Sequence, residues 1–234
     1  TELEIKYTPN EKNYITNLFI FKNNPNKTTN NLLFNADAIN QNTNTENYTI
    51  YNHFNHTLQL TEKTVLNNYF YLGNDKINEK TNIVSPVLNN FLSINLNEIV
   101  NQNANNKLFF IGNKSKIISK FKKIDLTNTI QLEYSKEQFK NTFLGNNQSF
   151  ASYQNNTNLH LTNLFQENTL RYNFSKKIDL TANLNFQNTI FNNNNISKNI
   201  FFVNPSIFLN IKKTGFGNFS LSFSENNTLP EINQ

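Results

Sequence analysis

The sequence lacks cysteine, methionine and tryptophan, and its 234 residues include only five glycines, five prolines and one arginine, Arg171. Without cysteine the chain can form no disulfide framework, thiolate nucleophile or cysteine-based metal site. No apolar run approaches the roughly 18 to 20 residues that a membrane-spanning helix needs. These absences argue against a disulfide-rich secreted domain, a cysteine enzyme and a helical membrane protein.

Charge is also scarce, at 16% of residues, and the formal net charge of +5 is carried almost wholly by lysine. Proteins that read nucleic acids cluster their basic residues and use arginine for bidentate contacts to bases and phosphates. Neither feature is present here, since the lysines are scattered along the chain. The sequence therefore predicts solvated lysines and no nucleic-acid partner.

The residues that are abundant are asparagine and the aromatics. About a fifth of the chain is asparagine, a bias that can signal disorder, but 22 phenylalanines and 9 tyrosines are far too many for a disordered polar tract. We therefore expect these aromatic side chains to form an extensive apolar surface that is shielded from water.

An alternation of apolar and polar residues dominates the chain. In FSKKIDLTANLNF, residues 174–186, the apolar side chains from Ile178 to Phe186 alternate with aspartate, threonine and asparagine. A period of two predicts β-strands, and these are longer than the five or six residues usual in soluble sheets. The pattern predicts ten strands in five hairpins: 2–8 with 13–22, 47–60 with 63–73, 107–120 with 124–136, 158–174 with 178–191, and 199–212 with 216–226.

The predicted connections alternate in length. Those within hairpins are short and carry lysine, at 9–12, 61–63, 122–123, 175–177 and 213–215. Those between hairpins are longer and rich in asparagine: 23–46, 74–106, 137–157, 192–198 and the residues after Glu225. In an antiparallel sheet, all long loops then lie at one end and all tight turns at the other.

Four segments depart from a plain strand pattern. The apolar phase slips between Leu161 and Leu164, which predicts a β-bulge. Pro205 removes a ladder donor, so the sequence predicts a bulge there or an edge strand. Segments 32–40 and 88–100 have mixed apolar spacing and are candidates for short helices inside the long loops.

These features together favour a transmembrane β-barrel. A sheet can cross a bilayer only as a closed barrel, with strands of about nine to eleven residues, apolar side chains toward lipid, short periplasmic turns and long extracellular loops. A soluble antiparallel sandwich also alternates, but its outer face usually carries many charges, whereas the polar face here is mostly Asn, Thr, Ser and Gln. Tryptophan is absent from the expected interfacial belt, and six tyrosines are candidates to replace it: Tyr14, Tyr48, Tyr69, Tyr71, Tyr134 and Tyr172.

The C-terminal third adds a family resemblance. Residues 167–192 and 201–234 contain NPS inside a strand, a tight turn with lysines, an alternating Ser/Phe strand and then LPEINQ. This region resembles the barrel of Bacteroidetes-type TonB-dependent outer-membrane receptors, which carry a regulatory-like β-domain before the plug. The match is most specific over 160–234 and weaker back to residue 1. The resemblance implies a 22-stranded barrel with an N-terminal plug and an energy-coupling box, neither of which is seen in this chain.

We therefore expect residues 1–234 to be one segment of an all-β, antiparallel transmembrane β-barrel, with the plug and the remaining strands outside this chain. The chain opens at TELEIKY as if inside a strand, with no signal peptide, which also predicts an internal segment. An open half would leave two unpaired strand edges in the membrane.

Candidate chemical sites are few. His53 and His56 are three apart, which places them on opposite faces of a strand, and His160 is isolated, so no metal or cofactor site is predicted. Glu133, Glu137 and Asp125 have no nucleophile or tuned histidine beside them, so no enzyme is predicted. Gly215 and Gly217 predict a hairpin turn, and the sequon at Asn47 is expected by chance in so asparagine-rich a chain.

The leading functional hypothesis is part of an outer-membrane receptor that binds an external ligand and mediates its uptake. The ligand site would lie in loops 23–46, 74–106 and 137–157 and on the lumenal face below them, and no single ligand-binding residue can be named. Its partners would be the rest of the barrel and its plug, outer-membrane lipid, surface lipoproteins and an inner-membrane energy-coupling complex. One alternative is a non-transporting barrel that acts as scaffold for surface lipoproteins, and another is a soluble extracellular β-domain for adhesion or sugar binding.

Overall fold

The computed structural model describes residues 1–34, 37–92, 98–145, 148–149, 154–194, 196–214 and 217–227. The elements, in order, are β1 (Glu2–Asn10), β2 (Asn13–Asn23), β3 (Asn26–Phe34), β4 (Asp37–Thr61), β5 (Thr64–Val84), α1 (Pro86–Phe91), β6 (Val100–Lys120), β7 (Ile124–Gly145), β8 (Gln148–Ser149), β9 (Asn155–Ser175), β10 (Ile178–Asn193), β11 (Ile196–Thr214) and β12 (Gly217–Ser224). Nearly the whole described chain is β-sheet.

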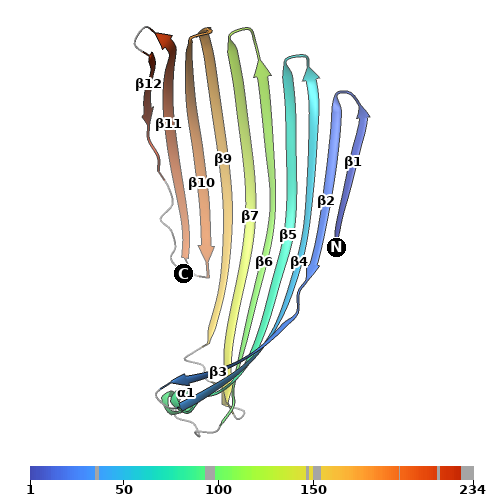
Figure 1. Cartoon of the computed structure of the whole chain (residues 1–234), viewed down its shortest axis with the longest axis vertical. Coiled ribbons are helices and arrows are strands. Elements are labelled where there is room, and N and C mark those ends of the chain that lie inside the picture. The colour runs from blue at the N-terminus through green and yellow to red at the C-terminus, as the bar shows by residue number, and fades with distance from the viewer. Residues whose placement is uncertain are drawn as a thin grey trace.

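All these strands belong to one antiparallel sheet. Its order is β1-β2-β4-β5-β6-β7-β9-β10-β11-β12, and two strands outside this order, β3 and β8, pair with β4 and β7. Figure 1 shows a single tall wall, with tight turns at one end and β3 and α1 at the other. The five predicted hairpins are confirmed, because each expected pair of strands is neighbouring and antiparallel.

The strands are longer than the sequence predicted, and the loops are shorter. β4 has 25 residues, and β5 and β6 have 21 each. The predicted loop 23–46 is largely β3 and the first part of β4, and 74–106 contains the end of β5, α1 and the start of β6. Likewise, 137–157 holds the end of β7 and the start of β9. Backbone pairing continues there although the outer face is mostly polar and the inner face is apolar only at scattered positions such as Ile77 and Phe139. The apolar alternation on which the prediction rested therefore ends before the strands do.

Of the two segments that were candidates for a short helix, one contains a helix and the described residues of the other do not. In 32–40, the described residues belong to β3 and β4. In 88–100, helix is present only at the start, in α1, and Val100 already belongs to β6, while 93–97 lie outside the described residues. α1 begins after Ser85, whose Oγ accepts a hydrogen bond from the Leu88 amide at 3.2 Å, a normal N-cap. In the part of the chain that the structure describes, no helix has the length and apolar character needed to cross a membrane.

The predicted bulge between Leu161 and Leu164 is wrong. β9 pairs with β7 and with β10 in unbroken register through this region, so the two leucines lie on opposite faces. At Pro205 the pairing with β10 is also unbroken, which excludes a bulge toward that strand. The Pro205 carbonyl accepts from the Glu225 amide at 3.0 Å, so its backbone polar side faces β12, whose ladder ends at Ser224. β11 is paired on both sides, so the edge-strand alternative is wrong as well. The missing N–H of Pro205 is on the side of β12, just beyond the end of that ladder, where no ladder donor is required.

One face of the sheet, here called the outer face, carries the apolar side chains. Leu126, Leu184 and Phe219 are 42%, 38% and 57% exposed, so no second layer covers them. Among the described residues, Val100 is the one hydrophobic side chain that is fully buried. The accessible surface is 15987 Å², against about 10,900 Å² for a globular protein of this mass. The sandwich alternative therefore fails, since an ordinary protein core is missing.

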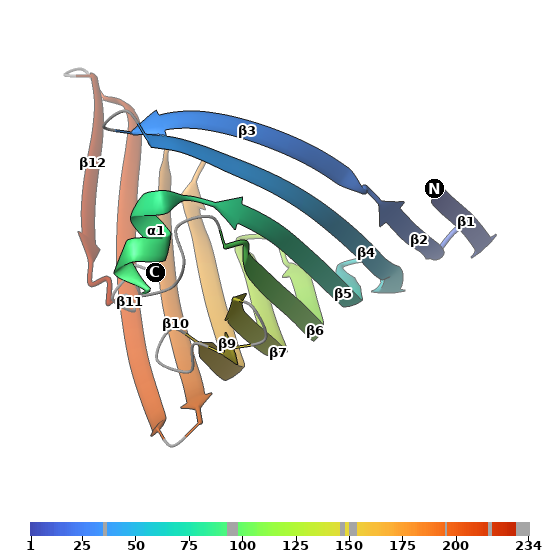
Figure 2. The same ribbon diagram turned by 90° about the horizontal axis from the view of Figure 1, so that it is seen from below.

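The opposite face, here called the inner face, is concave and crowded. Figure 2 shows the wall curving around α1. The strand residues that are buried apart from glycines, Thr81, Val100, Thr129, Asp179 and Thr189, all have the register of this face. The sheet curves toward these side chains, which brings them together and limits their exposure.

Polar side chains on the outer face bond to one another across strands. Asn52 donates to Asn17 at 2.8 Å, Asn113 donates to Asn68 at 3.1 Å, and Asn128 donates to Asn168 at 2.5 Å. An amide that met hydrocarbon without a partner would cost several kcal/mol. Cross-strand pairing lowers that cost and explains how asparagine is tolerated among the leucines.

The predicted tyrosine belt is half right. Tyr48, Tyr134 and Tyr172 lie on the outer face, but Tyr14, Tyr69 and Tyr71 lie on the inner face, by their register with neighbouring strands. A tyrosine has an apolar ring and a polar hydroxyl, so it fits either face of the sheet, and its residue type alone does not predict which face it occupies. Only the outer three can form an interfacial belt.

Candidate functional site

A cluster of rings surrounds two glycines on the inner face. Gly73 lies directly between Tyr51 and Phe110, and Gly112 is opposite Tyr71 on the adjacent strand. A Cβ on Gly73 would be 2.4 Å from Phe110 Cζ and 2.4 Å from Tyr51 Cδ1. Both glycines are therefore required because rings from the neighbouring strands lie over their backbones.

The same rings contact each other in a continuous row. The ring centroids are 5.4 Å apart for Tyr51 and Phe110, 6.1 Å for Phe110 and Tyr71, and 5.4 Å for Tyr71 and Tyr69. His53 stacks on Tyr69 at 5.8 Å, and its Nδ1 lies 2.5 Å from the Tyr69 hydroxyl. The row links β4, β5 and β6 through side chains as well as through backbone pairing.

Carboxylates orient two of the hydroxyls. The Tyr51 hydroxyl donates to Asp75, and the Tyr71 hydroxyl donates to Glu133. Gln131 also donates to the Tyr71 hydroxyl, at 3.3 Å. Hydrogen bonds to a carboxylate are stronger than those between neutral groups, so these contacts favour one orientation of each ring.

Beside the rings is a hollow of 220 Å³, here called the inner hollow. It is lined by Asn47, Thr49, Tyr51, Asp75, Ile77, Asn106, Leu108 and Glu137. Asn106 donates to Glu137 at 3.2 Å, while Asp75 Oδ1 and Asn106 Oδ1 are buried and have no hydrogen-bond partner in the protein. The inner hollow therefore presents acceptors, and it suits a ligand group that donates O–H or N–H.

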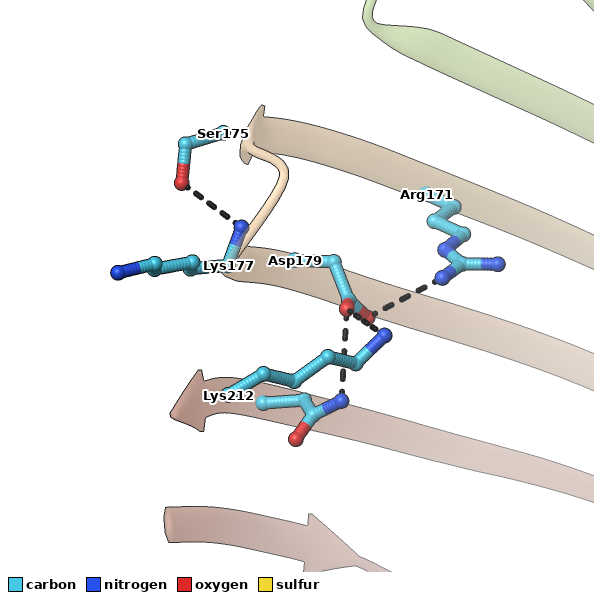
Figure 3. A network of polar contacts seen from close by, with 6 residues as sticks. Arg171, Ser175, Lys177, Asp179 and Lys212 are labelled. Carbon is cyan, nitrogen blue, oxygen red and sulfur yellow. Dashed lines mark hydrogen bonds and ion pairs between the residues drawn. The ribbon is translucent and has the colours of Figure 1, made fainter. Parts of the chain in front are cut away.

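A second polar network lies near the tight-turn end of the same face (Figure 3). Asp179 Oδ1 is 3.5 Å from Arg171 Nη2, and Asp179 Oδ2 is 3.5 Å from Lys212 Nζ. Asn210 also donates to Asp179, at 3.4 Å. The side chain of Asp179 is only 10% exposed, so two cations and an amide compensate a carboxylate that is largely removed from water.

The structure separates the histidines that the sequence considered for metal binding. His53 lies on the inner face beside Tyr69, and His56 lies on the outer face with Nε2 3.2 Å from Asn13 Oδ1. His160 pairs with Tyr134 on the outer face, at 2.8 Å from Nδ1 to the hydroxyl. Within the described ranges no group of three or more His, Asp or Glu residues is placed to hold a metal ion.

The acidic candidates do not form a catalytic pair. Glu133 and Glu137 share the inner face of β7, but four residues of strand separate them by roughly 13 Å, and each has its own partner. Asp125 is register partner to Arg171. Gly217 has φ +108 and closes the β11–β12 turn, where Gly215 lies outside the described residues. Asn47 lies in β4 and lines the inner hollow.

The ligand region expected in loops 23–46, 74–106 and 137–157 stays a prediction. The inner hollow does lie at the border of segments 74–106 and 137–157, but on strands rather than loops. Isolated glycines inside alternating strands, in YFYLG and FFIG, are the sequence signal of a close backbone approach at this place.

No protein-family model and no curated protein matches the chain by sequence. Solved structures do match its fold. The copper transporter OprC matches with a TM-score of 0.63 and 7% identity over 99% of this chain, and the unliganded ferric citrate transporter FecA with 0.55 and 9% over 94%. The ferric yersiniabactin uptake receptor FyuA from Yersinia pestis matches with 0.52 and 7% over 92%.

The chain spans 36%, 34% and 42% of those three structures. At such low identity the likeness concerns the fold alone. The fold is that of a transmembrane antiparallel β-barrel of the outer-membrane type, of which this chain forms an open wall. The predicted fold class is therefore confirmed.

Proposed function

We propose that this chain is part of the barrel of a TonB-dependent outer-membrane receptor, of the Bacteroidetes type that its C-terminal third resembles, and that the receptor binds an external ligand and mediates its uptake. The observation that carries the proposal is the separation of faces on a wall one layer thick. The outer face is apolar with nothing packed on it, and the inner face is polar and concave. A bilayer on one side and water on the other is the environment that fits both.

The two edge strands, β1 and β12, are evidence that the sheet is part of a larger barrel. All nine residues of β1 and all eight of β12 are exposed, and each strand has one unpaired side. In hydrocarbon those backbone groups would each cost several kcal/mol. Further strands pairing with β1 and β12 remove this cost, and a plug inside the completed barrel would contact the inner face.

The inner hollow is the proposed ligand-contact region on this wall. Its 220 Å³ is below the usual range for a complete small-molecule site, so it would be one contact area among several around the lumen. The three similar structures are described with a copper, a ferric citrate and a ferric yersiniabactin cargo. Because these cargoes differ, none is assigned to this protein.

The proposal is tested with the full-length protein that contains this chain. Membrane fractionation should place it in the outer membrane, and deletion of its gene should abolish growth on one of a panel of scarce nutrients offered as sole source. Glu137→Gln and Asp75→Asn should reduce uptake severalfold, whereas the matched outer-face variant Glu46→Gln should not. Normal growth of the deletion strain on every nutrient, together with tightly bound lipoproteins, would favour the scaffold alternative instead.

A further inference from the structure

Between the apolar part of the outer face, which ends at Leu72 on β5, and the α1 end of the sheet, the outer face carries a band of lysines, here called the lysine band. Its members are Lys76, Lys80, Lys107, Lys136 and Lys140, on β5, β6 and β7. Register places them on the outer face, since Lys76 pairs with Tyr48 and with Lys107, and Lys136 pairs with Phe109. Glu46 is the one acidic residue at this end of the outer face, among the described residues of β4 to β9.

The band begins where the apolar belt stops. Along β5 the outer-face residues change from Phe70 and Leu72 to Asn74 and Lys76, and along β6 from Phe109 to Lys107. Tyr134, which bonds to His160, lies at the same border on β7. Tyrosine, histidine and lysine are the residues expected at the headgroup level of a membrane protein.

Charge is segregated between the two faces at this level. The inner face of the same strands carries Asp75, Glu79, Glu133 and Glu137, and no lysine among the described residues from Gly73 to Ile83 and from Ser135 to Asn141. Lysines that served only to keep both faces soluble would be mixed with acids on each. The segregation gives the outer face a net positive charge at this level, which suits a negatively charged environment.

Two of the lysines are directly opposed. Lys76 and Lys107 are register partners on neighbouring strands, and like charges directly opposite one another destabilise a sheet. An anion between the two ammonium groups would remove this repulsion. Their juxtaposition therefore favours a bound phosphate or carboxylate rather than bulk water.

Three hollows follow the band, and lysine and asparagine side chains line each of them. One of 300 Å³ lies between Lys76 and Lys80, one of 440 Å³ between Lys80 and Lys27, and one of 340 Å³ beside Lys136 and His160. Asparagines from adjacent strands line all three: Asn42, Asn44, Asn78, Asn82, Asn103, Asn105, Asn158, Asn192 and Asn194. Glu46 and the inner-face residue Glu79 also line the first, so the other two hollows are the better anion sites. Ammonium groups surrounded by amide N–H₂ donors suit a phosphate attached to a sugar.

We propose that the lysine band binds the phosphorylated sugar headgroup of a lipid in the outer leaflet. The inference rests on the proposed membrane location, and it adds a specific lipid contact to it. Lysines near an anionic membrane surface each contribute roughly a fivefold change in affinity. Removal of three of them should therefore weaken binding by tenfold or more.

The test uses the full-length protein in detergent, with bisphosphorylated lipid A as the probe and native mass spectrometry or thermophoresis as the readout. The triple variant Lys76→Gln, Lys107→Gln, Lys136→Gln should bind lipid A at least tenfold more weakly. The matched control, Lys122→Gln, Lys123→Gln, Lys177→Gln, removes the same charge at the tight turns and should change binding less than twofold. If the triple variant fails to fold, Lys76→Gln and Lys107→Gln alone should each weaken binding severalfold.

Two further probes identify the source of the anion. Dephosphorylated lipid A should bind weakly and equally to the native protein and the variants, and inorganic phosphate should compete only at millimolar concentration. Equal lipid A binding by the triple variant, an equal loss in the control, or inorganic phosphate binding as tightly as lipid A would each overturn the inference. If the protein resides in the outer membrane and supports uptake but gives any of these results, only the lipid-binding inference is contradicted. If the protein is absent from the outer membrane, the proposed function is contradicted as well.

Discussion

At the scale of single residues, the inner face depends on contacts that tolerate little change. Gly73 and Gly112 are present because tyrosine and phenylalanine rings occupy the space where a Cβ would be. Asp179 is present because Arg171 and Lys212 converge on it. Each of these residues can be tested separately from the function of the protein.

Gly73→Ala should destabilise the wall. The new methyl group would meet Phe110 on one side and Tyr51 on the other, and Tyr51 is held by Asp75. Overpacking of this kind costs about 1 to 3 kcal/mol. Urea unfolding of the full-length protein in micelles, followed by circular dichroism, measures the loss, and Ala182→Val is the control, since Ala182 lines a hollow of 530 Å³ on the outer face. Equal stability of Gly73→Ala and the native protein would show that the rings can move aside.

Asp179→Asn should also reduce stability, by about 1 to 3 kcal/mol, because charge-assisted hydrogen bonds are lost and two cations lose their partner. The effect should shrink in 1 M salt, since Arg171 and Lys212 are 46% and 50% exposed and salt screens their attraction to the carboxylate. Lys177→Gln is the control, because the Lys177 ammonium points away from Asp179 (Figure 3). A loss of stability that salt does not change would mean that packing rather than charge explains it.

At the scale of strands and helices, alternation predicted the pairing well and the lengths badly. All five hairpins were recovered because tight lysine-bearing turns and a two-residue period are local signals. The ends of β4, β5, β6 and β7 were missed because their outer faces are mostly polar beyond the membrane level and their inner faces are apolar only at scattered positions. Asparagine-rich sequence of this kind resembles a loop. Backbone hydrogen bonds, which hold these ends together, leave no trace in the hydropathy pattern.

The same limit explains the errors at single elements. The phase slip at Leu161 and Leu164 resembles a bulge, but the strand simply carries leucine on both faces, as the unbroken pairing with β10 shows. The inner hollow could not be predicted, since Asp75, Asn106 and Glu137 come from three strands whose register is set by long-range pairing. Only the glycines inside β5 and β6 marked that region in the sequence.

Within β10, a charge should be tolerated on one face and not on the other. Leu184 is on the outer face, and Gln187 is on the inner face. A lysine facing the bilayer midplane costs about 2 to 4 kcal/mol in a transmembrane barrel, and far less in the lumen. Leu184→Lys should therefore lower the amount of full-length protein in the outer membrane much more than Gln187→Lys. Equal effects in quantitative immunoblots of membrane fractions would contradict the assignment of faces.

At the scale of the whole molecule, the wall is stable only with something on its outer face and along its edges. Its accessible surface exceeds that of a globular protein of equal mass by about a half. Residues 1–234 expressed alone should therefore be insoluble without detergent, with aggregation along β1 and β12. A monodisperse, detergent-free preparation with a cooperative thermal transition would instead support the soluble β-domain alternative.

The most direct measurement concerns the environment of the outer face. The chain has no cysteine, so single cysteines at successive positions from Leu180 to Ile190 in the full-length protein can each carry a nitroxide label in bilayers. Accessibility to oxygen, which concentrates in hydrocarbon, should rise at the even-numbered positions, and accessibility to a water-soluble nickel chelate should rise at the odd-numbered ones. Water exposure at the even-numbered positions, or no alternation, would show that this face does not contact lipid and would contradict the account.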